Sequence, residues 1–174
     1  PTVKLATEML MHTFVRTSEL IKAEWTEIDL EKRLWEIPAE RMKKNRTHLV
    51  PLSDRDIEIL EELKLYNGNR QYVFASPNRP SGPISNNTIL QALKRMGYAG
   101  KMTGHGFRHL ASTTLNEMGY SPDAIEKQLA HVDGSTRGVY NKAELIDERK
   151  KIMVEWSKYL LSLSNNVVPI KGAI

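Results

Sequence analysis

The sequence contains no cysteine and no long apolar run. Without cysteine, disulfide bonds and thiolate metal sites are excluded, which fits an intracellular protein. No segment approaches the roughly 20 apolar residues that a membrane-spanning helix needs, and no signal peptide is visible. Because the first residue is Pro1 instead of methionine, we expect the chain to be a piece of a longer protein.

The composition indicates one compact domain with a weak preference for a polyanionic partner. The chain has 174 residues, of which 40% are hydrophobic, enough for a core of ordinary size. Lysine and arginine number 25 against 21 aspartate and glutamate, and the sequence pI is about 9.3. A net charge of +4 favours nucleic acid only weakly, because many proteins that never meet DNA carry as much.

The most informative stretch runs from residue 103 to residue 140. Its first part predicts a helix, because apolar residues recur there at helical spacing. His105 and Arg108 are three residues apart, so they lie on one side of the same turn, near a helix N-terminus that favours an anion such as phosphate. We expect Arg108 to lie off the buried stripe of this helix, which is formed by Phe107, Leu110, Ala111, Thr114, Leu115 and Met118.

A second helix is expected directly afterwards. Residues 121–123, Ser-Pro-Asp, supply a cap, a proline for the first helical position and an acid for the first turn, so this helix should extend to about Ala130. His131 then stands at its C-terminal end. Tyr140 follows nine residues later, in a polar segment with little apolar material to bury.

The order His-x-x-Arg, then LAH, then eight residues and a tyrosine resembles the catalytic domain of the tyrosine recombinases, in particular the phage and genomic-island integrases. The resemblance extends from Leu5 to about Leu161. It implies a catalytic domain over residues 1–164, a tail over residues 165–174, and DNA-binding domains upstream that this chain does not include.

The whole pattern predicts a mainly α fold with a small antiparallel sheet of three strands. Apolar residues from Leu5 to Phe14 mark one face of an opening helix, and Thr17 or Ser18 can cap a second helix through Trp25. The other expected elements are strands at 27–30, 33–38 and 47–52, and helices from Ser53 to about Tyr66, from Ser85 to about Met96 and from Ile152 to about Leu163.

The resemblance assigns catalytic roles by position. Tyr140 would attack a DNA phosphate, and Arg16 and Arg108 would hold the charged phosphoryl oxygens. His131 would add a donor to the same oxygens, while His105 would take the tyrosine proton or hold the phosphate. Arg16 alone has a simpler explanation, since a cation complements a helix C-terminus. The segment TFVRTSEL, which contains Arg16, resembles the integrase segment that carries the first catalytic arginine, and this favours a catalytic role for Arg16.

The segment ERMKKNRT is a basic hairpin in which Asn45 is available for the turn. Charge runs of this kind are usually solvated turns. In the family, the hairpin before a segment like HLVPL carries a lysine that acts as general acid, and this match favours Lys43, with Lys44 as a close rival. We assign DNA contacts to Lys44, Arg46 and Arg137.

The resemblance also implies the product and the partners. Cleavage would leave a 3′-phosphotyrosyl link and a free 5′ hydroxyl, with no metal and no other cofactor. The partners would be double-stranded DNA attachment sites, bound by a tetramer of the whole protein in the bacterial cytoplasm, in association with the nucleoid. We expect the isolated piece to be a monomer and to show poor or absent recombination.

Three alternatives stay open at this point. His105, His109 and His131 could bind zinc, although Gly106 stands where a metalloprotease would carry its glutamate base. A helix-turn-helix module without activity is a second possibility. A type IB topoisomerase would share the active-site logic and would relax supercoils without joining two sites. His109 has no role in the recombinase mechanism, and we expect it to face a neighbouring helix or the backbone.

Overall fold

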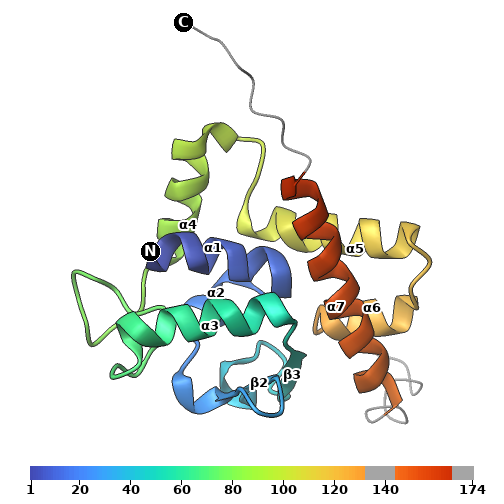
Figure 1. Ribbon diagram of the computed structural model, residues 1–174, viewed down its shortest axis with the longest axis horizontal. Coiled ribbons are helices and arrows are strands. Elements are labelled where there is room, and N and C mark those ends of the chain that lie inside the picture. Colours follow the sequence, from blue (N-terminus) through green and yellow to red (C-terminus); the bar gives the residue numbers. More distant parts are fainter. Residues whose placement is uncertain (132–143, 166–174) are drawn as a thin grey trace, which may run out of the picture.

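The computed structural model describes residues 1–131 and 144–165. It confirms the predicted fold class, because the fold is mostly helical with one small antiparallel sheet, which lies at the lower edge in Figure 1. In the described residues the elements are α1 (Thr2–Thr13), α2 (Thr17–Ile21), the 3-10 turn η1 (Trp25–Glu27), β1 (Ile28–Asp29), β2 (Leu34–Ile37), the 3-10 turn η2 (Ala39–Arg41), β3 (His48–Pro51), α3 (Asp54–Asn67), α4 (Asn86–Leu93), the π-helical turn η3 (Lys94–Tyr98), α5 (Gly104–Glu117), α6 (Pro122–Gln128) and α7 (Glu144–Asn165).

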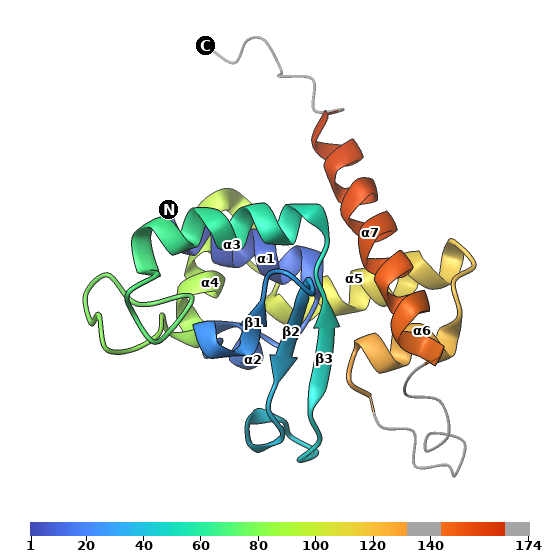
Figure 2. The same ribbon diagram turned by 60° about the horizontal axis from the view of Figure 1, so that its bottom comes forward.

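The sheet has the strand order β1-β2-β3, and both pairings are antiparallel. Trp35 pairs with Val50, and both side chains are buried against the helices, as the alternation of a half-buried strand requires. The connection between β2 and β3 extends away from the helices (Figure 2). Asn45 lies in this connection with a positive φ of 48°, which confirms its predicted turn.

Three helices begin directly after the serines predicted to cap them: α3 after Ser53, α4 after Ser85 and α6 after Ser121. The Ser53 side chain accepts a hydrogen bond from the Asp56 amide, and the Ser121 side chain accepts one from the Ala124 amide. Other predicted boundaries are wrong. α2 begins directly after Arg16 and ends at Ile21 instead of near Trp25.

One predicted helix end is confirmed, and one predicted helix start is wrong. α4 continues directly into η3, and Gly97, with a φ of 87°, interrupts the helical backbone directly after the predicted end at about Met96. α7 begins at Glu144, eight residues before the predicted start at Ile152. The periodicity concealed its first two turns because their residues are mostly polar and charged.

The apolar side chains form two clusters. The first joins α1, the sheet, α3 and α4, and the second joins α5, α6 and α7 around Phe14. In the second cluster, the ring of Trp156 meets Phe14 edge to face at 6.1 Å, and its Nε1 donates to the carbonyl oxygen of Met11 at 2.9 Å. α7 therefore packs on its own chain.

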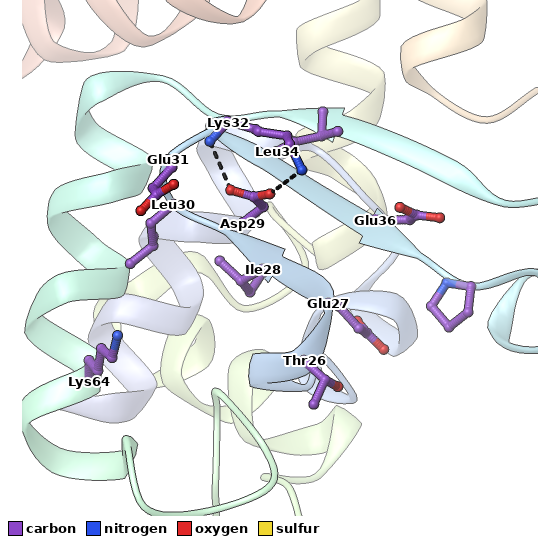
Figure 3. Close-up of a pocket in the computed structure, with 11 residues that line it drawn as sticks. Thr26, Glu27, Ile28, Asp29, Leu30, Glu31, Lys32, Leu34, Glu36 and Lys64 are labelled. Atoms are coloured by element: carbon purple, nitrogen blue, oxygen red, sulfur yellow. Dashed lines mark hydrogen bonds and ion pairs between the residues drawn. The ribbon is translucent and has the colours of Figure 1, made fainter.

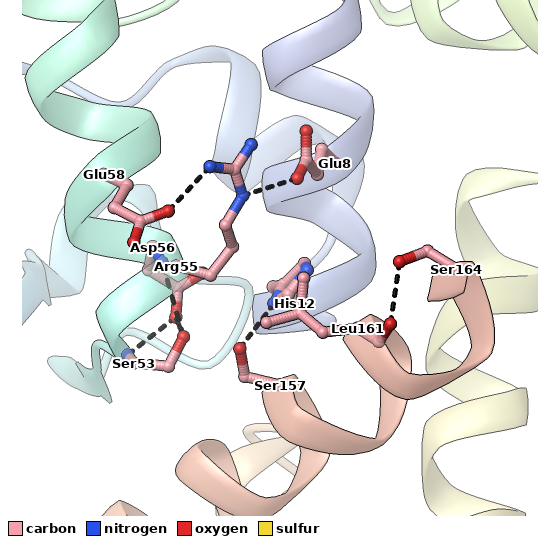
Figure 4. Close-up of polar contacts among 9 residues, drawn as sticks. All are labelled: Glu8, His12, Ser53, Arg55, Asp56, Glu58, Ser157, Leu161 and Ser164. Carbon is pink, nitrogen blue, oxygen red and sulfur yellow. Dashed lines mark hydrogen bonds and ion pairs between the residues drawn. The ribbon is translucent and has the colours of Figure 1, made fainter. Parts of the chain in front are cut away.

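Polar contacts hold α1 between α3 and α7 (Figure 4). Arg55 on α3 pairs with Glu8 on α1 at 2.7 Å and with Glu58 at 2.7 Å. On the other side, Nδ1 of His12 lies 3.1 Å from the Ser157 hydroxyl. Burial lowers the pKa of His12. α1 is thus fixed on both sides, which places its C-terminal end beside α5 and α6.

We expect Trp156→Ala to lower the free energy of unfolding by about 3 to 5 kcal/mol, because it removes a buried ring from the second cluster and leaves a cavity. Leu163 on the same helix is 48% exposed and supplies the control. Leu163→Ala should cost about 0.5 kcal/mol or less in the same denaturant titration. Equal losses would show that α7 is not packed on its own chain.

Candidate active site

Three of the predicted catalytic residues face one hollow of about 310 Å³. Arg16 comes from the junction of α1 and α2, whereas His105 and Arg108 come from the first turns of α5. The remaining lining residues are Thr17, Ser18, Asn86 and Gly104. Two cations and a histidine thus converge on a concave surface next to the N-terminus of α5, where the helix dipole favours an anion.

Arg108 is the most buried of the predicted site residues that the structure describes, with 4% of its surface exposed. Its Nη1 donates to the carbonyl oxygen of Phe14 at 2.7 Å, and its Nη2 donates to the carbonyl oxygen of Leu129 at 2.6 Å. Both acceptors lie at helix C-terminal ends, those of α1 and α6, where the dipoles stabilise a cation. Burial, followed by the nearby charge of Arg16, lowers the pKa of Arg108 to about 10, so the guanidinium stays charged at neutral pH.

The predicted position of Arg108 off the buried stripe is wrong. The buried face of α5 consists of Phe107, Arg108, Ala111 and Leu115, whereas Leu110 and Met118 are 46% and 43% exposed. Arg108, Ala111 and Leu115 have the helical spacing i, i+3, i+7, so the arginine belongs to the stripe. The prediction was wrong because it considered apolar residues alone, so it included Leu110 in the buried face and left out Arg108. His109 is exposed, so the expectation that it faces a neighbouring helix is also wrong.

Arg16 is held by Glu19, a residue that the sequence analysis missed. The Arg16 Nη1 lies 2.7 Å from Oε1 of Glu19, and the Arg16 amide donates to Oε2 at 2.9 Å. Glu19 is 3% exposed, whereas the Arg16 side chain is 30% exposed toward the hollow. The sequence does contain a signal for this contact, because an acidic residue in the third position of a helix commonly accepts a hydrogen bond from the backbone amide of the residue before the helix.

Gly104 lets α5 approach α2 closely enough to form the hollow. A Cβ atom at this position would lie 2.2 Å from the Thr17 hydroxyl oxygen and 3.3 Å from Leu10 Cδ2. A larger residue would displace the Thr17 side chain or the start of α5. The glycine therefore permits the close approach of Arg16 to the pair His105 and Arg108.

His131 follows α6 and is brought to Arg108. Its Nδ1 lies 2.7 Å from Oε2 of Glu126, and its Nε2 lies 3.5 Å from Nη2 of Arg108. Ala130 has a φ of 52°, which turns the chain out of α6 at this point. Glu126 thus orients the imidazole ring with its Nε2 on the side of the buried arginine.

The basic hairpin stands apart from the hollow. Lys43, Lys44 and Arg46 are exposed, and none of them lines the hollow. Tyr140 and Arg137 lie outside the described residues. The structure therefore gathers Arg16, His105, Arg108 and His131 from the predicted set and leaves the roles of the other residues as expectations.

A buried junction lies behind these residues. Arg149 on α7 donates through Nε to Oε1 of Gln128 on α6 at 2.9 Å, and through Nη2 to the carbonyl oxygen of Leu49 on β3. His48 on β3 is 7% exposed and donates to the backbone of Gln128. Burial, then the charges of Arg149, Arg108 and Arg16, lower its pKa to about 3 despite that bond.

A larger hollow, of about 700 Å³, lies over the sheet and carries the opposite charge (Figure 3). Its charged lining is mainly acidic, with two lysines. Asp29 pairs with Lys32 at 2.9 Å at its rim. This acidic lining repels a phosphate backbone, so the smaller hollow is the one suited to nucleic acid.

Comparison with known proteins identifies the family. The model of the phage integrase family matches residues 2–145. The chain belongs to the phage integrase family. Prophage integrase IntA of Escherichia coli K12 is 44% identical over 146 residues, which are 83% of this chain and 35% of that relative. The integrase chain thus spans about a third of the length of this relative.

Two solved structures share the fold of this chain. The integrase of mycobacterium phage Brujita matches with a TM-score of 0.69 at 20% identity, over 87% of this chain and 50% of its own. The integrase of transposon Tn1549, in complex with a circular intermediate DNA, matches with a TM-score of 0.56 at 13% identity, over 92% and 58%. These likenesses concern the fold. The relatives favour neither a topoisomerase nor a DNA-binding module without activity.

The described residues contain neither a cluster of metal ligands nor a membrane-spanning helix. Across residues 1–131 and 144–165, no three side chains of His, Asp or Glu gather as a metal ion would require, and His105, His109 and His131 form no such group. Within the same ranges, every helix is too short or too polar to cross a membrane.

We expect the integrase chain to lose stability on acidification partly through His48. The unfolded histidine takes up a proton as the pH falls through about 6.5, whereas the folded one resists because its pKa is about 3. Between pH 7 and pH 4.5 this difference should remove about 2 to 3 kcal/mol of unfolding free energy.

Denaturant titrations at both pH values measure the effect. His48→Gln should start less stable at pH 7 and should lose less on acidification than the unsubstituted chain. The variant retains His12, whose pKa is also lowered, so the comparison isolates His48. The same loss in both proteins would contradict the assignment.

Proposed function

We propose that this chain is the catalytic domain of a site-specific recombinase, which integrates or excises a prophage or genomic island by cutting and rejoining DNA. The observation that carries the proposal is the convergence of Arg16 and Arg108 on one hollow at a helix N-terminus. Family membership supports it. The catalytic domain would comprise residues 1–164, followed by a tail, with DNA-binding domains preceding it in the whole protein.

Strand exchange needs a nucleophile that forms a reversible bond to phosphorus. In the proposed reaction the Tyr140 oxygen attacks the phosphate and the bond from phosphorus to the 5′ oxygen breaks. The 3′-phosphotyrosyl link keeps the bond energy that hydrolysis would release, and a 5′ hydroxyl of a second strand attacks it to reseal the DNA. A phenol suits this exchange because its pKa near 10 makes it a better leaving group than an alcohol.

The arginines would stabilise the charge that develops during attack. Negative charge increases on the oxygens of phosphorus, and fixed donors aimed there stabilise the transition state more than the ground state. Arg108 is held by two carbonyl groups and Arg16 by Glu19, so neither has to be ordered when DNA binds. A planar guanidinium also offers two parallel donors to a phosphate.

The histidines and the hairpin would handle protons. His105 in the first turn of α5 would take the tyrosine proton or hold the phosphate, and His131 would add a donor beside Arg108. The 5′ oxygen needs a proton as it leaves, and Lys43 would supply it, with Lys44 as the alternative. The arginines supply the positive charge, so the proposed reaction uses no metal and no other cofactor.

The distribution of charge along the sequence supports a DNA-facing surface. Residues 63–116, which include α4 and most of α5, contain no aspartate or glutamate. A surface without acids lowers the electrostatic cost of approaching the phosphate backbone. Outside this stretch, Lys44, Arg46 and Arg137 would add contacts to the backbone. The basic residues within the stretch are Lys64, Arg70, Arg79, Lys94, Arg95, Lys101 and Arg108.

The assembly and place of action complete the proposal. Recombination pairs two double-stranded attachment sites and exchanges four strands, so the whole protein would act as a tetramer on DNA. It would do so in the bacterial cytoplasm, in association with the nucleoid. By itself this chain would bind DNA weakly, because few phosphates are neutralised without the preceding domains.

Covalent trapping tests the function. A nicked duplex is prepared from the DNA that adjoins the gene, so that a short fragment diffuses away after cleavage and the protein stays attached. We expect the whole natural protein to give a band of reduced mobility in a denaturing gel. Tyr140→Phe should abolish this band while leaving DNA binding unchanged.

Tyr159→Phe is the matched control, because Tyr159 stacks on Trp156 in the second cluster, away from the hollow. It should leave the covalent band intact. Binding without any covalent band from the unsubstituted protein would overturn the proposal in favour of a DNA-binding module without activity.

We expect Glu19→Gln to slow the formation of the covalent band about 10- to 100-fold, because Arg16 loses its charged partner and one oxygen that accepts the Arg16 amide or guanidinium. Glu31, which is exposed and lines the larger hollow instead of the smaller one, supplies the control. Glu31→Gln should cleave at the normal rate. If Glu19→Gln also cleaved at the normal rate, Arg16 would not depend on this contact.

A further inference from the structure

Arg41 lies at the base of the hairpin that carries Lys43, and the mechanism above gives it no role. It is the last residue of η2, and its side chain is 17% exposed. Its Nη1 donates to both carboxylate oxygens of Glu27, and its Nη2 donates to the carbonyl oxygen of Glu19 on α2. A single guanidinium thus bridges the hairpin to two other elements.

Both partners of Arg41 are themselves fixed. The Glu27 side chain is 8% exposed, and its Oε2 also accepts a hydrogen bond from Nε1 of Trp35 on β2 at 3.0 Å. Glu19 is the residue whose carboxylate holds Arg16. Arg41 is therefore linked to the sheet through Glu27 and to Arg16 through Glu19.

The chain leaves the body of the protein directly after this anchor. Met42 is buried at 8% exposure, and residues 43–47 are all exposed. Lys43 is two residues beyond Arg41, so the position of Arg41 sets the point from which the Lys43 side chain extends. Through Glu19, the same contact fixes that point relative to Arg16.

We propose that Arg41 is a positioning residue that holds the start of the Lys43 hairpin in register with Arg16. This inference rests on the proposed function of Lys43 as the general acid. When Arg41 is removed, the Lys43 amine is unchanged, but the backbone that precedes it is no longer anchored. Proton delivery to the leaving 5′ oxygen should therefore fail more often. General acid catalysis contributes about 100- to 10,000-fold, and a displaced acid loses part of this.

A pair of DNA substrates separates this role from a merely structural one. The first is a nicked duplex with the natural 5′ oxygen at the cleavage site, and the second carries sulfur in place of that oxygen. A thiol has a pKa near 8.5, so the thiolate leaves without a proton and needs no acid. A defect in positioning the acid should disappear on the sulfur substrate, whereas a defect in Arg16 or in folding should persist.

In the whole natural protein, we expect Arg41→Gln to cleave the oxygen substrate about 10- to 100-fold more slowly than normal and to cleave the sulfur substrate within about threefold of normal. Lys43→Ala provides the reference for loss of the acid. Arg33→Gln is the matched control, because Arg33 directly precedes β2, at the opposite end of that strand from Arg41, and also pairs with a carboxylate, that of exposed Asp54. It should behave normally on both substrates.

Two results would overturn the inference. Normal cleavage of the oxygen substrate by Arg41→Gln would show that the anchor is not needed, and equal slowing on both substrates would show that Arg41 acts through Arg16 or the fold. If thermal melting shows that Arg41→Gln is unfolded, Arg41→Lys is scored by the same criteria, since it keeps the charge beside Glu27 and cannot bridge both partners. No cleavage of either substrate by the unsubstituted protein would instead refute the proposed function.

Discussion

The buried guanidinium of Arg108 is the interaction on which the rest of the structure depends. It lies where the C-terminal ends of α1 and α6 meet α5, and it donates to a carbonyl oxygen from each. A buried cation without such partners would be strongly destabilising. Here two helix dipoles and two charge-assisted hydrogen bonds stabilise it. The same side chain therefore holds three helices together and places a positive charge in the hollow.

The other site residues are arranged around this centre by short local contacts. Phe14, whose carbonyl group accepts from Arg108, stands two residues before Arg16, and Leu129 stands two residues before His131. The same guanidinium thus fixes the chain next to two further site residues. Gly104 then brings α5 against α2, and Glu19 holds Arg16 toward the hollow. Every contact in this network joins residues of the chain itself, which agrees with preorganised stabilisation of a transition state.

Much of this could be predicted from the sequence because the signals are local. Ser53 and Ser121 mark helix starts, Asn45 marks a turn, and three short strand-like segments mark the sheet. What failed depends on tertiary contacts. The burial of Arg108 could not be read from apolar periodicity, because its partners are carbonyl groups 94 and 21 residues away. Asn86, whose helix lies far along the chain, carries no local signal that it shares a hollow with Arg16.

The central claim is that Arg108 stabilises charge on a DNA phosphate in addition to holding the helices together. Cleavage of DNA with a methylphosphonate at the scissile position tests it most directly, because a methyl group replaces one charged oxygen. On the natural phosphate, Arg108→Ala should be about 100- to 1000-fold slower than the unsubstituted protein. On the uncharged methylphosphonate, the two proteins should differ by about tenfold or less. An equal deficit on both substrates would contradict the account and leave Arg108 a structural role alone.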